Sequence, residues 1–358
     1  MKNLISGDLT TGYPGNLSIN RSTNPNCRSV VLVPQKFTGP FKIAIAASTL
    51  AFAGSIYGLV HTAGTTLKRE LDPVYSTLTE VQNVPQGVFI YGGATTFAPL
   101  RSPVILAAIN EAHPRFYPVY TESMDDQLGS AREIQRLLAD QISFAESSRS
   151  LRAAEKKTAQ RKGFELAQIP VAWDGIAFFV HPELSIPGLT LSQISLIYTG
   201  KVSNWEELGG PNLPITPYSL NPPTSGTASI LQEAVLAGEF GATVEIVENT
   251  TLAIRQVAQT PGGIGYASAA VVVGQETVAT IAIAGENGKF VSPATSAEVN
   301  TAAFADGSYP LTRKLYVVVK RDGSVDEQAG NAYANLLLST QGQQLIEQVG
   351  FAPYRDYP

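Results

Sequence analysis

Short apolar runs alternate with segments of helical periodicity between residues 87 and 358, and this alternation predicts a mixed α/β fold. Residues 87–91 indicate a strand, and 92–98 indicate a loop after it. Pro99 suits the first turn of a helix, whose apolar face would be Val104, Ile105, Ala108 and Ile109. The pattern therefore predicts a strand, a loop and a helix in succession.

Two further units also contain a loop that leads into a helix. In one, Ser130 and Glu133 form a capping-box pattern ahead of a helix, and a strand follows over 142–145. In the other, a strand over 215–218 leads through a proline-rich turn to 225–227 and a helix over 228–236.

All three units place glycine and hydroxyl residues directly before the N-terminus of a predicted helix. The first backbone N–H groups of a helix have no partner within it and carry partial positive charge, so they donate readily to a small oxyanion. Serine and threonine also cap helices for structural reasons alone. A single loop of this kind does not distinguish a helix cap from an anion-binding site, and the occurrence of three such loops favours an anion-binding site.

An uncharged apolar run over residues 43–60 is long enough for a transmembrane helix. Basic residues outnumber acidic ones before it, so the positive-inside rule places the N-terminus in the cytoplasm and residues 64–358 outside. The alternative is a cleaved signal peptide, because 51–53 has the small-x-small form of a cleavage site. We favour an uncleaved anchor in the cytoplasmic membrane, because cleavage there would leave a short apolar core behind an unusually long leader.

The sequence thus predicts four regions. Residues 1–42 form a disordered cytoplasmic tail, 43–63 the single membrane anchor, and 64–86 a polar linker. Residues 87–358 form the folded domain.

Composition excludes several classes of function. With 358 residues, 44% of them hydrophobic, and a net charge of −5, the chain can bury a large core but lacks the basic balance of a nucleic-acid binder. Its single cysteine, Cys27, excludes a disulfide within the chain, and its scattered histidines fit no metal-ligand spacing. The motifs of a nucleophile elbow, a zinc protease and a Walker loop are absent from the sequence. We therefore expect no metal, no cofactor, no nucleic-acid partner and no catalysis.

The order of several motifs resembles that of the periplasmic phosphate-binding proteins of phosphate ABC transporters. The matching segments are GATTFAPL (93–100), GS (129–130), FAESSR (144–149), WDGIA (173–177), YTGKVSNW (198–205), SGT (225–227), GGIGY (262–266) and GFAP (350–353). The resemblance is collinear over nearly all of 87–355, which makes it more specific than any single motif.

This resemblance implies a two-lobed, type II periplasmic-binding-protein fold, in which hinge crossover strands join two α/β lobes and the ligand lies between them. Lobe 1 would comprise 87–171 and 267–358, and lobe 2 would comprise 172–266. Carried over motif by motif, the ligand-binding residues would be Thr95, Thr96, Phe97, Ser130, Ser147, Ser148, Arg149, Ser225, Gly226 and Thr227.

The function implied by the resemblance is non-catalytic binding of phosphate or a related small oxyanion outside the cytoplasmic membrane, for delivery to the permease subunits of an ABC transporter. Two alternatives stay open. One is a membrane-tethered oxyanion sensor, and the other is a surface-anchored phosphatase.

Two positions depart from the family pattern. An arginine usually precedes the SGT motif, where this chain has Leu220 and Asn221, and an aspartate is common where it has Ser148. The arginine would bond the anion through a full charge, and the aspartate would accept a proton from phosphate and so reject sulfate. We therefore expect weaker phosphate binding and poorer discrimination against sulfate than in the family at large.

Overall fold

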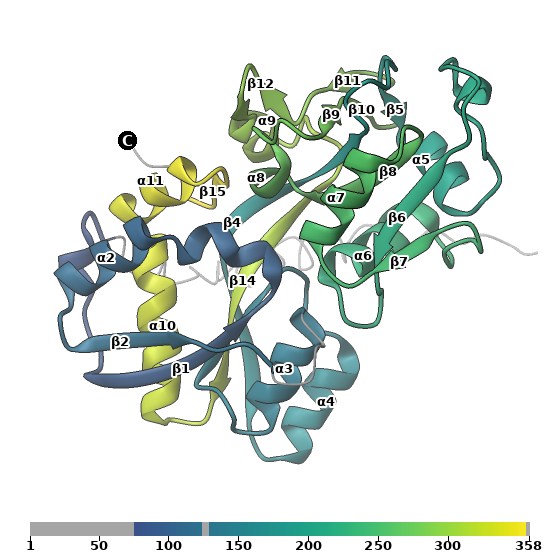
Figure 1. Cartoon of the computed structure of the whole chain (residues 1–358). Coiled ribbons are helices and arrows are strands. Elements are labelled where there is room, and N and C mark those ends of the chain that lie inside the picture. The colour runs from purple at the N-terminus through teal and green to yellow at the C-terminus, as the bar shows by residue number, and fades with distance from the viewer. Residues whose placement is uncertain (1–74, 124–128, 356–358) are drawn as a thin grey trace, which may run out of the picture. The chain divides into compact units, whose positions relative to one another are not determined.

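One long strand, β4 (Glu165–Val180), takes part in two successive groups of strands. Its first part pairs with β14 (Thr312–Arg321), and its last residues, from Ile176 onward, pair with β8 (Gly263–Ser268) and β9 (Ala279–Ile281). The computed structural model describes residues 75–123 and 129–355. Figure 1 shows β4 and β14 running between the two groups of elements that we call the first and second lobes.

The strands of the first lobe join parallel and antiparallel pairs in one sheet. The strand β1 (Gly87–Gly93) lies between β2 (Phe116–Tyr120) and β3 (Phe144–Ser147) and is parallel to both. The strand β14 is antiparallel to β3 and to β4, and the short β15 (Ala352–Pro353) also pairs with β4. Because β1 and β3 run in the same direction, their carboxyl ends lie at the same edge of the sheet.

Helices cover both faces of this sheet. One face packs against α2 (Pro103–Ala112), α10 (Val325–Leu338) and α11 (Thr340–Gln348), and the other packs against α3 (Ser130–Leu138) and α4 (Ala153–Arg161). The alternation of side chains along a strand produces this arrangement. In β14, Val317 and Val319 join the core beneath α10, while Val318 between them joins the core beneath α3.

The second lobe has its own core around β6, β8 and the last part of β4. Its strands are β5 (Leu189–Thr190), β6 (Thr216–Leu220), β7 (Glu245–Val247), β8, β9, β10 (Ile283–Ala284), β11 (Phe290–Val291), β12 (Ala294–Thr295) and β13 (Glu298–Val299). Its helices are α5 (Leu191–Tyr198), α6 (Gly226–Leu231), α7 (Thr250–Gln259), α8 (Ala269–Val272) and α9 (Thr301–Ala305). A single π-helical segment, Gln232–Leu236, continues α6.

The predicted mixed α/β class is confirmed, and several local predictions need correction. The strand over 87–91 is present as β1, but the next residues form a 3₁₀ helix, Thr95–Arg101, and the α-helix begins only at Pro103. Val104 is exposed while Ile105 and Ile109 are buried, so the apolar face of α2 is narrower than predicted. The capping box at Ser130 is also wrong, since Ser130 is the first helical residue.

The boundaries of the lobes stay a prediction, although packing points to a later return of the chain than the one predicted. The prediction assigned residues 267–358 to lobe 1. Buried apolar residues from Ala267 to Leu311, among them Phe304 and Tyr309, contribute instead to the core of the second lobe. The predicted tail, the anchor and residues 64–74 of the linker lie outside the described residues. Residues 75–86 of the predicted linker are described, and Leu78 and Val81 among them are buried in the core of the first lobe. No helix within 75–123 or 129–355 has the length and apolar character needed to cross a membrane.

Candidate anion-binding site

The carboxyl ends of four strands meet at one pocket. Apart from Gly129, which directly precedes α3, the lining residues lie at or just after the ends of β1, β3, β6 and β7, as the general rule for ligands of open α/β sheets predicts. The lining residues are Ala94, Thr95, Thr96, Gly129, Ser148, Leu220, Asn221, Thr224, Ser225, Gly226, Thr227, Glu248 and Asn249.

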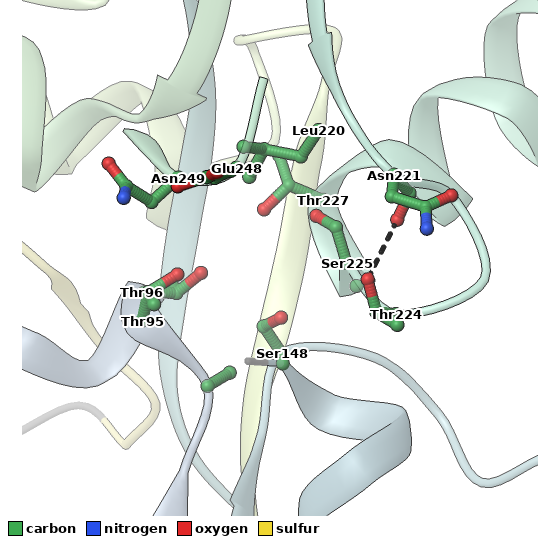
Figure 2. Close-up of a pocket in the computed structure, with 13 residues that line it drawn as sticks. Thr95, Thr96, Ser148, Leu220, Asn221, Thr224, Ser225, Thr227, Glu248 and Asn249 are labelled. Atoms are coloured by element: carbon green, nitrogen blue, oxygen red, sulfur yellow. Dashed lines mark hydrogen bonds between the residues drawn. The ribbon is translucent and has the colours of Figure 1, made fainter. Parts of the chain in front are cut away.

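The pocket is small and polar. The volume open to the centre of a water molecule is only about 20 Å³, which is little more than a single water needs. Hydroxyl side chains from both lobes face this space, and Figure 2 shows the oxygens of Thr96 and Thr227 pointing toward each other across it. Of the described residues that line the pocket, none is basic and Glu248 is the acidic one. The size and the hydroxyl lining suit a small oxyanion better than a sugar or an amino acid.

Six of the predicted binding residues line this pocket. Thr95 and Thr96 come from the loop after β1, Ser148 from the loop after β3, and Ser225, Gly226 and Thr227 from the start of α6. Ser225 caps α6 by accepting a hydrogen bond from Ala228 N, at 3.2 Å. The N–H groups of Gly226 and Thr227 lie in the first turn, where a helix supplies no partner of its own. Capping by Ser225 therefore leaves the first N–H groups of α6 available as donors.

Phe97 and Ser147 do not line the pocket. The backbone N–H of Phe97 donates to Ala94 O at 2.9 Å, and its ring is fully buried in the core of the first lobe. The hydroxyl of Ser147 donates to Arg149 O at 2.8 Å and so stabilises the turn itself. These two predicted ligands hold loops in place in the structure.

Ser130 lies directly behind the pocket wall. Its Oγ accepts from the backbone N–H of Ser148 at 3.0 Å and lies 3.2 Å from the hydroxyl of Ser148. Ser130 thereby fixes the position of Ser148, which does line the pocket.

Arg149 points elsewhere. Its guanidinium bonds both carboxylate oxygens of Glu155, at 2.6 and 3.1 Å, and the backbone oxygen of Ser150. It lines a neighbouring cleft with Arg152 and Lys314. The sequence predicted Arg149 as a ligand-binding residue. Because Glu155 already balances the charge of its guanidinium, Arg149 supplies little positive charge to the pocket.

Sequence reasoning missed a buried arginine at the site. Arg313, on β14, donates from Nη1 to Thr227 Oγ1 at 2.7 Å and from Nη2 to Thr96 Oγ1 at 3.1 Å. Its Nε donates to Asp174 Oδ2 at 2.8 Å. The sequence carries no clear signal for it, because Arg313 is one of four basic residues in β14, TRKLYVVVKR.

Asp174 is the cross-strand partner of Arg313. The two residues face each other in the register of β4 and β14, and Asp174 also accepts from Ser268 Oγ at 2.6 Å. Burial raises the pKa of the Asp174 carboxyl, although Arg313 and Ser268 both act to lower it. Asp174 therefore joins β4 to β14 through Arg313 and to β8 through Ser268.

Two glycines of the site lie directly against the opposite lobe. A Cβ on Gly129 would overlap the backbone carbonyl oxygen of Thr224 in the opposite lobe, and Gly129 has a φ of +133°. A Cβ on Gly226 would overlap Ser148 Oγ and would lie 2.9 Å from Ser130 Oγ. The absence of a side chain at each glycine therefore permits a close contact across the pocket, with a backbone carbonyl at Gly129 and with two serine hydroxyls at Gly226.

A buried ion pair holds the loop after β1 and the loop after β3 together beneath the pocket. Arg101 Nη1 donates to Glu146 Oε2 at 2.6 Å, Tyr333 donates to Glu146 Oε1 at 2.8 Å, and Ala94 N donates to Glu146 O. Burial raises the pKa of the Glu146 carboxyl to about 7, against the opposing effect of Arg101. The loops that carry Thr95 and Ser148 are thus attached to one rigid base.

The fold and the pocket together define the class of protein, a two-lobed α/β binding protein with a site for a small ligand between its lobes. The model of the PBP superfamily domain matches residues 80–341. The chain belongs to this superfamily.

Comparisons with individual proteins agree. The chain is 27% identical over 259 residues to the phosphate-binding protein PstS of Pseudomonas aeruginosa, covering 68% of this chain and 77% of that protein. It is 26% identical over 237 residues to the phosphate-binding protein PstS of Staphylococcus aureus, covering 64% of this chain and 70% of that protein. The resemblance inferred from the motifs is therefore confirmed.

Solved structures show the same fold. A putative phosphate ABC transporter substrate-binding protein with bound phosphate from Clostridium perfringens aligns with a TM-score of 0.62 and 24% identity, covering 75% of this chain and all of that one. An ABC-type phosphate transport receptor from Vibrio cholerae aligns with a TM-score of 0.55 and 21% identity, with the same two coverages.

Proposed function

We propose that this protein binds phosphate between its two lobes, without catalysing a reaction, and delivers it to an ABC-type permease. The observation that carries the proposal is the small, hydroxyl-lined pocket at the start of α6, with donors from both lobes. The names of the relatives, which are phosphate-binding proteins, favour phosphate among small oxyanions.

The test is isothermal titration of the purified full-length protein with phosphate, arsenate and sulfate, together with three single variants. Thr96→Ala and Thr227→Ala each remove a hydroxyl that faces the pocket, and Ser130→Ala removes the support of Ser148. Each should lose about 0.5–1.5 kcal/mol of phosphate binding, the value of a neutral hydrogen bond. If all three variants bound every anion as tightly as the parent, the assignment of the site would fail.

The proposal places the binding domain outside the cytoplasmic membrane, with residues 43–60 as the anchor. This part rests on the apolar run and on the charge asymmetry before it. Fractionation of cells that express the tagged full-length chain should recover it with the membranes, together with permease subunits. A soluble form that begins near residue 54 would instead support the cleaved signal peptide.

A further inference from the structure

The buried guanidinium of Arg313 lies between the two loops that face each other across the pocket. Its partners Thr96 and Thr227 both line the pocket and come from opposite lobes. Arg313 is only 5% exposed and is held against Asp174, whose side chain is fully buried. The position is therefore fixed by packing and by the ion pair, before any ligand enters.

The direction of these hydrogen bonds sets the direction of the threonine hydroxyls. A guanidinium has five N–H donors and no acceptor, so both threonine oxygens must accept from it. Each hydroxyl hydrogen is then free to point away from Arg313, toward the space that the two side chains share. Arg313 thereby turns Thr96 and Thr227 into donors, which is what an oxyanion needs.

The bonds to Asp174, Thr96 and Thr227 account for three of these N–H groups, and two are left over. If the ion pair served only to join β4 and β14, the guanidinium of Arg313 would need no partner besides Asp174. The additional bonds bring the guanidinium within one hydrogen bond of two hydroxyls that line the pocket, although Arg313 itself lines the neighbouring cleft and not the pocket. Charge-assisted hydrogen bonds from arginine suit the oxygens of phosphate.

We propose that Arg313 is the cation that coordinates the bound phosphate, reaching the site from β14 and replacing the arginine that the family usually carries before the SGT motif. This inference rests on the proposed function, phosphate binding. The sequence predicted a site without an arginine before the SGT motif, because the chain has Leu220 and Asn221 where the family usually has one. In this inference Arg313 supplies that positive charge from a different strand, β14.

Binding measurements on paired variants test this role. Arg313→Gln alone would leave Asp174 buried without its partner, so the main variant is Arg313→Gln with Asp174→Asn, which removes both charges together. Titration with inorganic phosphate should show affinity roughly 10- to 100-fold weaker than that of the parent, the range expected for a lost charge-assisted hydrogen bond. Thermal unfolding without phosphate establishes that each variant is folded.

Three further variants separate coordination from support of the fold. Asp174→Asn alone removes a negative charge next to the anion and keeps Arg313, so its affinity should equal or exceed that of the parent. Arg313→Lys keeps the charge but cannot donate to both threonines and Asp174 at once, so its affinity should fall. Arg321→Gln, on the same strand but in an exposed pair with Glu327, should bind as the parent does.

The outcomes distinguish this inference from the proposed function. A parent protein that does not bind phosphate would overturn both. A parent that binds phosphate, with a folded double variant of equal affinity, would overturn the role of Arg313 alone. Equal losses in Asp174→Asn and in the double variant would show that the pair only supports the strands.

Discussion

Gly129→Ala should weaken phosphate binding by about 10- to 100-fold. The added methyl group would overlap the carbonyl oxygen of Thr224, which belongs to the backbone of the opposite lobe and has no rotamer to adopt. Overpacking of this kind costs about 1–3 kcal/mol. Each 1.4 kcal/mol by which it destabilises the arrangement in which the two lobes touch at this point lowers the affinity tenfold. Isothermal titration with phosphate measures the loss.

Gly163→Ala is the matched control. Gly163 also has a positive φ, +88°, so alanine is strained there too, but a Cβ at Gly163 would meet nothing within 4 Å. Both variants should lose some thermal stability, and only Gly129→Ala should lose affinity. Parental affinity in Gly129→Ala would mean that phosphate binds without the close approach of Gly129 to Thr224.

The fold was predictable where a local pattern determines structure. The strand over 87–91 is present as β1, and in the predicted hydroxyl loop before a helix Ser225 caps α6. The start of α2 was not, because Thr95–Arg101 satisfies its backbone as a 3₁₀ helix before Pro103. Both Pro99 and Pro103 suit a helix start, and tertiary packing decides between them.

The site was predictable in its loops and not in its charge. Thr96 and Thr227 stand in recognisable motifs next to helix starts, so their local setting reveals them. Arg313 is 217 residues from Thr96 along the chain, and only the pairing of β14 with β4 brings it to the pocket. No spacing rule connects residues so distant, and the same reason hides the match of Gly129 to Thr224. Arg149 shows the reverse case, since its place in a site motif suggested a ligand while Glu155 is its actual partner.

The two pocket glycines form a reciprocal pair. Gly129, in the first lobe, faces the backbone of the second, and Gly226, in the second, faces the hydroxyls of Ser130 and Ser148 in the first. The obstacles differ, because a serine hydroxyl can rotate and a backbone carbonyl cannot. Substitution of Gly226 should therefore have a graded effect that depends on the size of the new side chain.

Gly226→Ala should lower phosphate affinity by roughly tenfold, and Gly226→Val by more. The Cβ of alanine would displace Ser148 Oγ and crowd Ser130 Oγ, breaking the bond that orients Ser148 toward the pocket, at a cost near the lower end of about 1–3 kcal/mol for overpacking. Helix propensity works in the opposite direction, since alanine stabilises a helix relative to glycine, so a weaker affinity cannot come from a weaker α6.

Gly238→Ala in the same lobe is the control, because a Cβ there would meet only Leu236 O, at 3.8 Å. It should bind phosphate as the parent does. The Gly226 variants are titrated beside it, and their thermal unfolding is followed in the absence of phosphate. If Gly226→Val bound phosphate as tightly as Gly238→Ala, the anion could not lie between α6 and Ser148, and the pocket formed by these loops would not be the binding site.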